Sequence, residues 1–235
     1  MLPSTPTPSW AHASRSVRRV LLRAMLVAWS TWFASGSGAH AQTAAAQRVV
    51  VRSYNTIGLP LAMLNHAETT VGELLHDAGI DSSWRNCRTM NGPSSQSDDM
   101  CGETLDAAEL IVRIVATPRT ISDAEVLGYS QVDAYRRQGA LATVFADRIR
   151  ALAAALRIDE GTLLGRAITH ELGHLLLGTL DHADTGLMRG AWNTPGRRRG
   201  DWLFSSAEAS RMRAGLDART QAPLLAVAHA SQSSR

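Results

Sequence analysis

The sequence predicts an α+β domain in which a twisted mixed sheet packs against helices. Segments 48–54 and 109–116 are almost continuously apolar and rich in β-branched residues, which is typical of buried strands. Segments 61–78 and 160–177 repeat apolar residues at the spacing of a helix. One strand and one helix come first, several strands follow, and helices come last. That order favours a sheet with the 160–177 helix packed beneath it.

The first strand and helix are bounded by residues that break regular structure. We expect strand 48–54 at a central position of the sheet, because it lacks the alternation of a half-exposed strand. The run Gly58-Leu59-Pro60 ends it, and helix 61–78 then places its apolar residues on one face. Gly79 suits the position after a helix, and a short second strand is expected over 80–84.

The middle of the chain alternates strands with turns. Segment 109–116 is the clearest strand, and Pro118 closes it because proline cannot donate to a strand ladder. Further strands are expected over 126–132 and 139–143. The polar, irregular segment 87–106 before them predicts a surface loop.

The last third is predicted to be mainly helical. The apolar period changes to that of a helix over 144–156. Asp159 is a candidate N-cap for helix 160–177, whose surface is so largely apolar that we expect it to be buried. A final helix is expected over 205–216, and residues 220–235 are expected to form a flexible tail.

Residues 1–41 predict a signal peptide. They contain four arginines and no acids, then an apolar run over 24–34, and end in Ala39-His40-Ala41. We expect cleavage after Ala41, which would make the protein secreted or periplasmic. The apolar run is short for a membrane span, so no stable insertion is expected after cleavage. An uncleaved N-terminal anchor is the alternative, and the sequence does not decide between the general and the twin-arginine export route.

Export changes the charge of the chain. The whole sequence has 24 basic and 21 acidic residues, hence +3, and loss of the four signal-peptide arginines leaves 20 − 21 = −1. The basic character of the precursor therefore does not indicate a nucleic-acid partner. Residues 42–219 are long enough for a single domain with its own core. The sequence does not indicate an oligomeric state.

Segment 168–188 carries the strongest chemical signal. His170 and His174 flank Glu171 in the pattern H-E-x-x-H on the predicted buried helix. Residues four apart share a helix face, so the two imidazoles can reach one metal ion. Glu171 lies beside the first ligand, where a carboxylate can deprotonate a metal-bound water. A lone histidine on an apolar helix is usually a core residue, but this combination is specific enough to predict a metal site.

A catalytic zinc site usually has three protein ligands, so one more is needed. The candidates are His182, Asp181, Asp184 and Glu208. Gly178 tolerates positive φ and can end the helix in a sharp turn, which would let the chain double back. We therefore favour His182. A histidine would also leave the site more electropositive than a carboxylate would, which favours an acidic water.

These residues resemble the metzincin group of zinc endopeptidases, whose motif is H-E-x-x-H-x-x-G-x-x-H with a downstream methionine turn. The resemblance implies a metzincin-like catalytic domain over 42–219 and Zn²⁺ as the cofactor. It also implies Glu171 as general base and acid, and Met188 as an apolar floor beneath the ligands. The residues that carry it are His170, Glu171, His174, Gly178, His182 and Met188.

The sequence departs from that motif at two places. Three residues separate His174 from Gly178, and three more separate Gly178 from His182, where the family has two in each case. One additional helical residue rotates the exit of the chain by about 100°. The second additional residue offers a way to compensate.

Cys87 and Cys101 are the two cysteines of the chain. In an exported protein such a pair usually forms a disulfide, and this one would close a loop of about 15 residues for roughly 3 kcal/mol. The alternative is a free thiolate that covers the metal in a latent form.

Together these features predict a secreted zinc-dependent metalloendopeptidase that acts on a peptide or protein substrate. An extended substrate would pair with a sheet edge, for which 126–132 is a candidate. Two alternatives remain open: a zinc hydrolase with Glu208 as its third ligand, and an exported module that binds zinc without catalysis.

Overall fold

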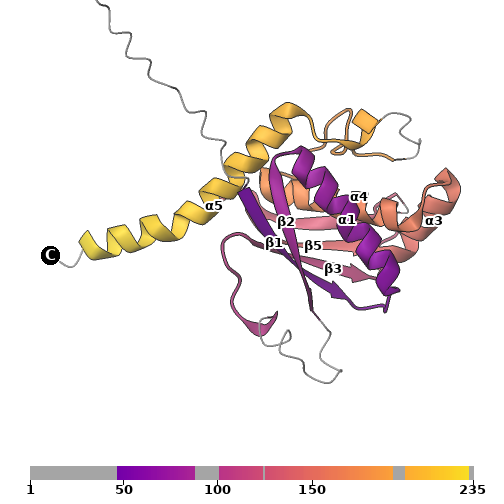
Figure 1. Ribbon diagram of the computed structural model, residues 1–235, viewed down its shortest axis with the longest axis horizontal. Helices are drawn as coiled ribbons and strands as arrows, with labels where there is room; N and C mark the ends of the chain where they lie inside the picture. The colour runs from indigo at the N-terminus through magenta and orange to yellow at the C-terminus, as the bar shows by residue number, and fades with distance from the viewer. Residues whose placement is uncertain (1–46, 88–100, 124, 193–198, 233–235) are drawn as a thin grey trace, which may run out of the picture. The chain divides into compact units, whose positions relative to one another are not determined.

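The computed structural model describes residues 47–87, 101–123, 125–192 and 199–232. The predicted signal peptide and its cleavage site lie outside these residues. Within them, no helix combines the length and the apolar character that a membrane crossing requires. The elements in chain order (Figure 1) are β1 (Gln47–Asn55), α1 (Leu61–Asp77), β2 (Ile80–Cys87), β3 (Glu109–Val115), β4 (Gly128–Asp133), β5 (Gln138–Phe145), α3 (Ala146–Leu156), α4 (Glu160–Leu177), the 3₁₀ helix η1 (Arg199–Trp202) and α5 (Ser206–Gln232).

The five strands form one mixed sheet in the order β2-β1-β3-β5-β4. Strands β2, β1, β3 and β5 are parallel, and β4 pairs antiparallel with β5 at one edge. β1 and β3 both lie inside the sheet, and for β1 this confirms the central position that its nearly continuous apolar sequence predicted. The architecture confirms the predicted α+β class with a mixed sheet and helices.

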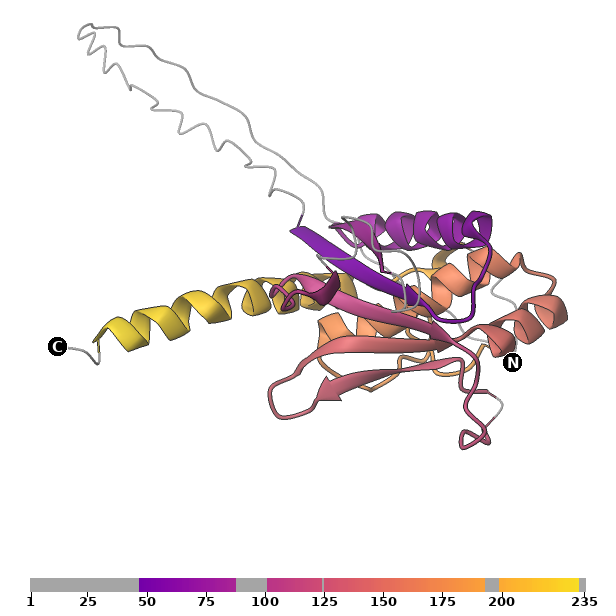
Figure 2. The same ribbon diagram turned by 90° about the horizontal axis from the view of Figure 1, so that it is seen from below.

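Helices α1 and α4 lie side by side against the sheet (Figures 1 and 2). Fifteen of the 18 residues of α4 are buried, as its apolar surface predicted. Burying one large aliphatic side chain contributes roughly 1.5–3 kcal/mol, so this helix is central to stability. The core residues that surround it include Val49, Val51, Val71, Leu75, Leu110, Val112, Ile114, Leu163, Leu164, Leu172 and Met212.

Asp159 caps the N-terminus of α4 as predicted, and its carboxylate accepts the Thr162 N–H at 2.8 Å. The preceding border was predicted wrongly. Val144 and Phe145 end β5 and pair with Ile114 and Val115 of β3, so α3 begins at Ala146 and not at 144. The two apolar side chains matched the helical period, but pairing with β3 outweighs that local pattern.

The last helix is longer than expected. It was predicted to end at 216, before a flexible tail over 220–235, but α5 continues to Gln232. The guanidinium of Arg219 in α5 donates to the main-chain oxygens of Ala107, Gly139 and Glu109, and these hydrogen bonds hold α5 against the sheet.

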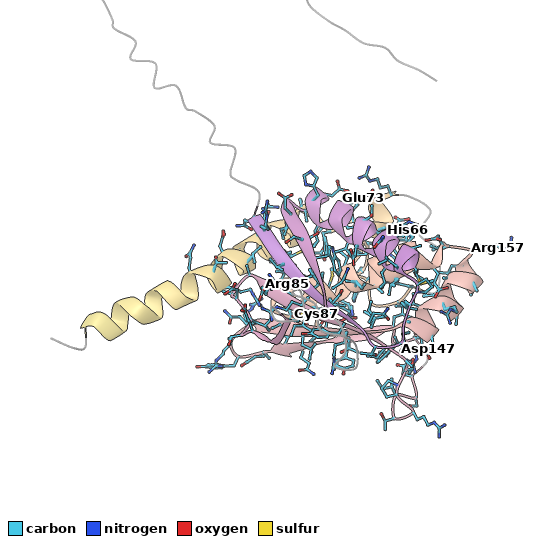
Figure 3. The ribbon with its side chains drawn as sticks, turned by 60° about the horizontal axis from the view of Figure 1, so that its bottom comes forward. His66, Glu73, Arg85, Cys87, Asp147 and Arg157 are labelled. Atoms are coloured by element: carbon cyan, nitrogen blue, oxygen red, sulfur yellow. A yellow bond between two sulfur atoms is a disulfide. The ribbon has the colours of Figure 1, made fainter. Side chains whose placement is uncertain are left out.

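A buried ion cluster joins the three strands on the β2 side of the sheet. Glu109 of β3 accepts hydrogen bonds from Arg52 of β1 and, at 2.7 Å, from Arg85 of β2. The predicted disulfide joins Cys87 to Cys101 with Cα atoms 5.8 Å apart. Arg85 and Cys87 are both labelled in Figure 3. Arg52 also donates to the main-chain oxygen of Glu103, so the cluster anchors the chain that follows the disulfide.

The pKa of the Glu109 carboxyl reflects two opposing effects. Burial raises it, but the hydrogen bond and charge of Arg52, the Asp106 N–H and the charge of Arg85 outweigh burial. The result is a pKa below the ordinary value, so the ionised carboxylate stabilises the folded state.

We therefore expect Glu109→Gln to lower the free energy of unfolding at pH 7 by about 3 kcal/mol, because it removes the carboxylate charge that compensates the buried guanidinium of Arg52. The lowered pKa means that the wild-type contribution is complete above the ordinary carboxyl pKa and is lost as the pH falls through the folded value. The difference between the two proteins should therefore shrink in acid. Urea unfolding at pH 7 and at pH 3 measures it, and an equal difference at both pH values would contradict the assignment.

Candidate metal centre

Helix α4 presents His170 and His174 on one face. Their Nε2 atoms lie 3.0 Å apart, with ring centroids separated by 4.7 Å. The ring of His182 lies 5.2 Å from that of His170 and 4.9 Å from that of His174, centroid to centroid. One nitrogen from each of the three rings lies within 4.8 Å of the others. The altered spacing of the motif therefore does not keep His182 away from the other two histidines.

Gly178 explains how the chain turns back. Its φ of 63° is in the left-handed region, and its N–H donates to the His174 oxygen at 2.9 Å. A Cβ at this position would lie 2.1 Å from the main-chain oxygen of Arg137 in the β4–β5 turn. Glycine is thus required both by conformation and by close approach. The additional residue in the last turn of α4 and the one after Gly178 together bring His182 to the helix face.

Main-chain oxygens orient two of the imidazoles. His170 Nδ1 lies 2.9 Å from the Leu187 oxygen, and His174 Nδ1 lies 2.9 Å from the Thr179 oxygen. A carbonyl oxygen only accepts, so each Nδ1 carries the hydrogen and each Nε2 directs its lone pair toward the cluster. This is the arrangement of a metal-ligating histidine and its supporting partner.

Burial also keeps the α4 imidazoles neutral. The pKa of His170 is lowered to about 3, chiefly by burial and in smaller part by the nearby His174, His182 and Arg189, while the hydrogen bond to the Leu187 oxygen acts in the opposite direction. The pKa of His174 is lowered chiefly by burial as well. Neutral imidazole is the form that binds a metal, so the protein does not have to remove protons from these rings near neutral pH.

The segment after His182 packs under α4. The Leu187 N–H donates to the Leu203 oxygen at 2.9 Å, and the Met188 oxygen accepts the Ala183 N–H at 2.9 Å. Met188 is buried, and a Cβ on Gly173 would lie 2.6 Å from its Sδ. Met188 therefore lies against the helix turn between His170 and His174.

Glu171 is buried beside the histidines. Its Oε2 lies 2.7 Å from the Ser130 hydroxyl of β4. Burial raises the pKa of the carboxyl to about 7, and the Ser130 hydrogen bond acts in the opposite direction. Glu171 borders a cavity of about 600 Å³ together with His170 and His182. The remaining lining residues are Asp123, Glu125, Val126, Leu127, Gly128, Arg148, Ala151, Leu152, Ala167, Arg189, Gly190 and Trp192.

The carboxylates that the sequence offered as third ligands do not lie with the histidines in the structure. Glu208 forms a capping box at the start of α5, where its Oε2 accepts from the Ser205 N–H at 2.7 Å and from the Ser205 hydroxyl at 2.8 Å. Asp181 accepts from the Thr179 hydroxyl. Asp181 and Asp184 are solvent-exposed, as His182 is, but in the described residues neither carboxylate joins the cluster of His170 and His174. In the described part of the chain, the three histidines alone form a cluster with metal-ligating geometry.

Two further features lie beside the predicted site residues. Ser130 reaches Glu171 from a strand 41 residues earlier, and no local pattern marks such a contact. Trp192 packs edge-on against His170 with centroids 5.5 Å apart, and Trp202 packs edge-on against Trp192 at 5.2 Å. The guanidinium of Arg189 lies 4.1 Å from the Trp202 ring centroid. Trp192 and Trp202 both follow Met188 closely in the sequence, and this position already marked their segment as a candidate wall of the cleft.

No family model matches the chain, and no curated protein matches its sequence. Among solved structures, the chain is similar to archaemetzincin from Methanopyrus kandleri, with 14% identity and a TM-score of 0.46 over 72% of this chain and 96% of that one. It is also similar to metalloproteinase-II from Bacteroides fragilis, with 15% identity and a TM-score of 0.46. That alignment covers 72% of this chain and 53% of the other, so the chain spans about half the length of that protein.

Proposed function

We propose that this chain is a secreted or periplasmic zinc-dependent metalloendopeptidase. In this proposal His170, His174 and His182 bind Zn²⁺, and Glu171 is the general base. The observation that carries the proposal is the convergence of three imidazole nitrogens beside a buried carboxylate at the wall of a cavity.

The donor set fits zinc. Catalytic zinc sites commonly have three protein ligands and one open position, and three histidines are a known set. Zinc–nitrogen distances of about 2.0–2.1 Å in a tetrahedron place ligand nitrogens about 3.3 Å apart. The Nε2 atoms of His170 and His174 are 3.0 Å apart, which is close to that value. The ligand nitrogens of all three histidines lie within 4.8 Å of one another, so small movements of the rings would bring them to tetrahedral spacing. Met188 would form the apolar floor beneath the ligands.

A bound zinc ion would supply a Lewis acid that acidifies water and polarises a carbonyl group. The protein's own residues supply the rest. Glu171 accepts a proton at its carboxylate and later delivers it to the leaving amine. Trp192 packs edge-on against the His170 ring and forms part of the cavity wall at that side of the site.

We infer that the substrate is a peptide or protein. β4 is an edge strand of the sheet, and its Ser130 touches Glu171, so an extended peptide added at this edge would pass beside the base. This refines the predicted edge 126–132 to Gly128–Asp133. The charge of the exported chain does not favour nucleic acid. The signal-like residues 1–41 support export without stable membrane insertion, and the disulfide suits an oxidising compartment.

The two alternatives fit these contacts less well. A third ligand at Glu208 would have to break the capping box of α5. A purely structural zinc site has no use for a buried, cavity-lining carboxylate beside its ligands, whereas a hydrolase requires one.

Zinc content should depend on His182 and not on Glu208. We expect about one zinc ion per wild-type chain and loss of most of it in His182→Ala, since two ligands hold zinc weakly. Glu208→Ala should keep its zinc and lose about 1 kcal/mol of stability with the helix cap. Mass spectrometry of purified, dialysed proteins measures the metal. Zinc release by Glu208→Ala alone would favour the glutamate-liganded alternative.

Hydrolysis should depend on Glu171 when zinc is retained. We expect Glu171→Gln to bind zinc like wild type and to cleave casein at least about 100-fold more slowly, because it cannot accept a proton. A chelator should abolish wild-type cleavage, and added zinc should restore it. Full zinc occupancy without cleavage of casein or of a broad peptide library would instead favour the non-catalytic zinc module.

A further inference from the structure

Ser130 lies in the middle of β4 and contacts the residue assigned as the base. Both side chains are almost inaccessible, with Ser130 7% and Glu171 7% exposed. The Ser130 Oγ lies 2.7 Å from Glu171 Oε2 and 2.8 Å from the Glu171 main-chain oxygen. A buried hydroxyl with two acceptors at this range has a defined role in the packing of β4 against α4.

A hydroxyl has one hydrogen, so Ser130 can donate to only one of the two acceptors at a time. A main-chain oxygen in the middle of a helix already accepts from the following turn. An ionised carboxylate is the stronger acceptor, because its hydrogen bonds are charge-assisted. The hydroxyl hydrogen therefore points to Oε2 whenever Glu171 is ionised.

Gly128, two residues earlier, occupies the neighbouring position on the same side of β4. A Cβ there would lie 3.1 Å from Glu171 Oε1 and 2.5 Å from the Thr143 oxygen. β4 therefore has no side chain beside Oε1, where Gly128 lies, and it holds Oε2 through the Ser130 hydroxyl. Both Gly128 and Glu171 line the cavity, so this residue pair borders the space in which a substrate would bind.

We propose that Ser130 is a positioning residue for Glu171: it holds Oε2 against β4 so that Oε1 is the oxygen that exchanges the proton. The inference rests on the proposed role of Glu171. It makes the strand expected to pair with the substrate also the strand that aims the base. Without the hydroxyl, the carboxylate is free to rotate away from the reacting atoms, while the edge that binds the substrate is unchanged.

The test compares Ser130→Ala with Ser130→Thr, which restores a hydroxyl on a residue suited to strands. Ser53→Ala is the matched control, because Ser53 is another buried serine of the sheet whose hydroxyl bonds a side chain, that of Asn86. Each variant is made in the full exported chain, together with Glu171→Gln. The measurements are zinc content, kcat and KM for a fluorogenic peptide cleaved by wild type, and the crystal structure.

We expect Ser130→Ala to keep its zinc and its KM within about twofold, and to lose about ten- to hundredfold in kcat, a part of what general base catalysis supplies. Ser130→Thr should recover most of that loss, and Ser53→Ala should lose none. In crystals, the Glu171 carboxylate should leave its wild-type position in Ser130→Ala and keep it in Ser130→Thr.

The results distinguish a failure of the positioning role of Ser130 from a failure of the proposed function. If Glu171→Gln is inactive but Ser130→Ala keeps the wild-type kcat or the wild-type carboxylate position, the positioning role is wrong and the proposed function stands. If Glu171→Gln cleaves as fast as wild type, the proposed function is wrong, and the Ser130 role in catalysis falls with it. A kcat loss shared equally by Ser53→Ala would show a structural effect and would also overturn the positioning role.

Discussion

The structure depends on the burial of α4, a helix that is covered on nearly all sides and still carries two imidazoles and a carboxylate. Polar groups cost free energy in such a place unless each has a partner. Every polar group of the motif has one: the Leu187 oxygen for His170, the Thr179 oxygen for His174, and Ser130 for Glu171. These partners belong to β4 and to the chain after α4. The hydrogen bonds that the buried polar groups of α4 require therefore also hold those segments around the site.

The same constraint explains why neutral imidazoles occur here. Burial that opposes a charge on His170 and His174 also removes competing water from their Nε2 atoms. The Nε2 atoms of His170 and His174 therefore present their lone pairs to each other at 3.0 Å, an arrangement that a cation between them would stabilise. The contacts of these two rings thus support the proposed metal site independently of any similarity to other proteins.

The strong periodic signals of the sequence predicted the central strand β1, the buried helix and the pair His170 and His174, whereas His182 was favoured because Gly178 lets the chain turn back. Those features depend on local patterns, such as the apolar runs of β1 and β3 or the i, i+4 spacing of His170 and His174. The end of β5 was wrong because Val144 and Phe145 match both periods, and only the partner strand decides. Ser130 was missed because its importance comes entirely from a contact with α4. The sequence could not show whether the chain turns back to the metal site at Gly178. The two additional residues each rotate the direction of the chain, and the turn between them decides whether the two rotations add or cancel.

The close approach of Gly178 to the Arg137 oxygen affects how this fold can vary. The β4–β5 turn is exposed, and Tyr135 at its tip is 96% accessible, so it would ordinarily be a place where insertions are tolerated. Here the turn meets the end of α4 at the residue from which the chain sets out toward His182. Lengthening the turn would move the Arg137 backbone that packs against Gly178. A surface hairpin far from the motif in sequence is therefore constrained in length by the geometry of the three histidines.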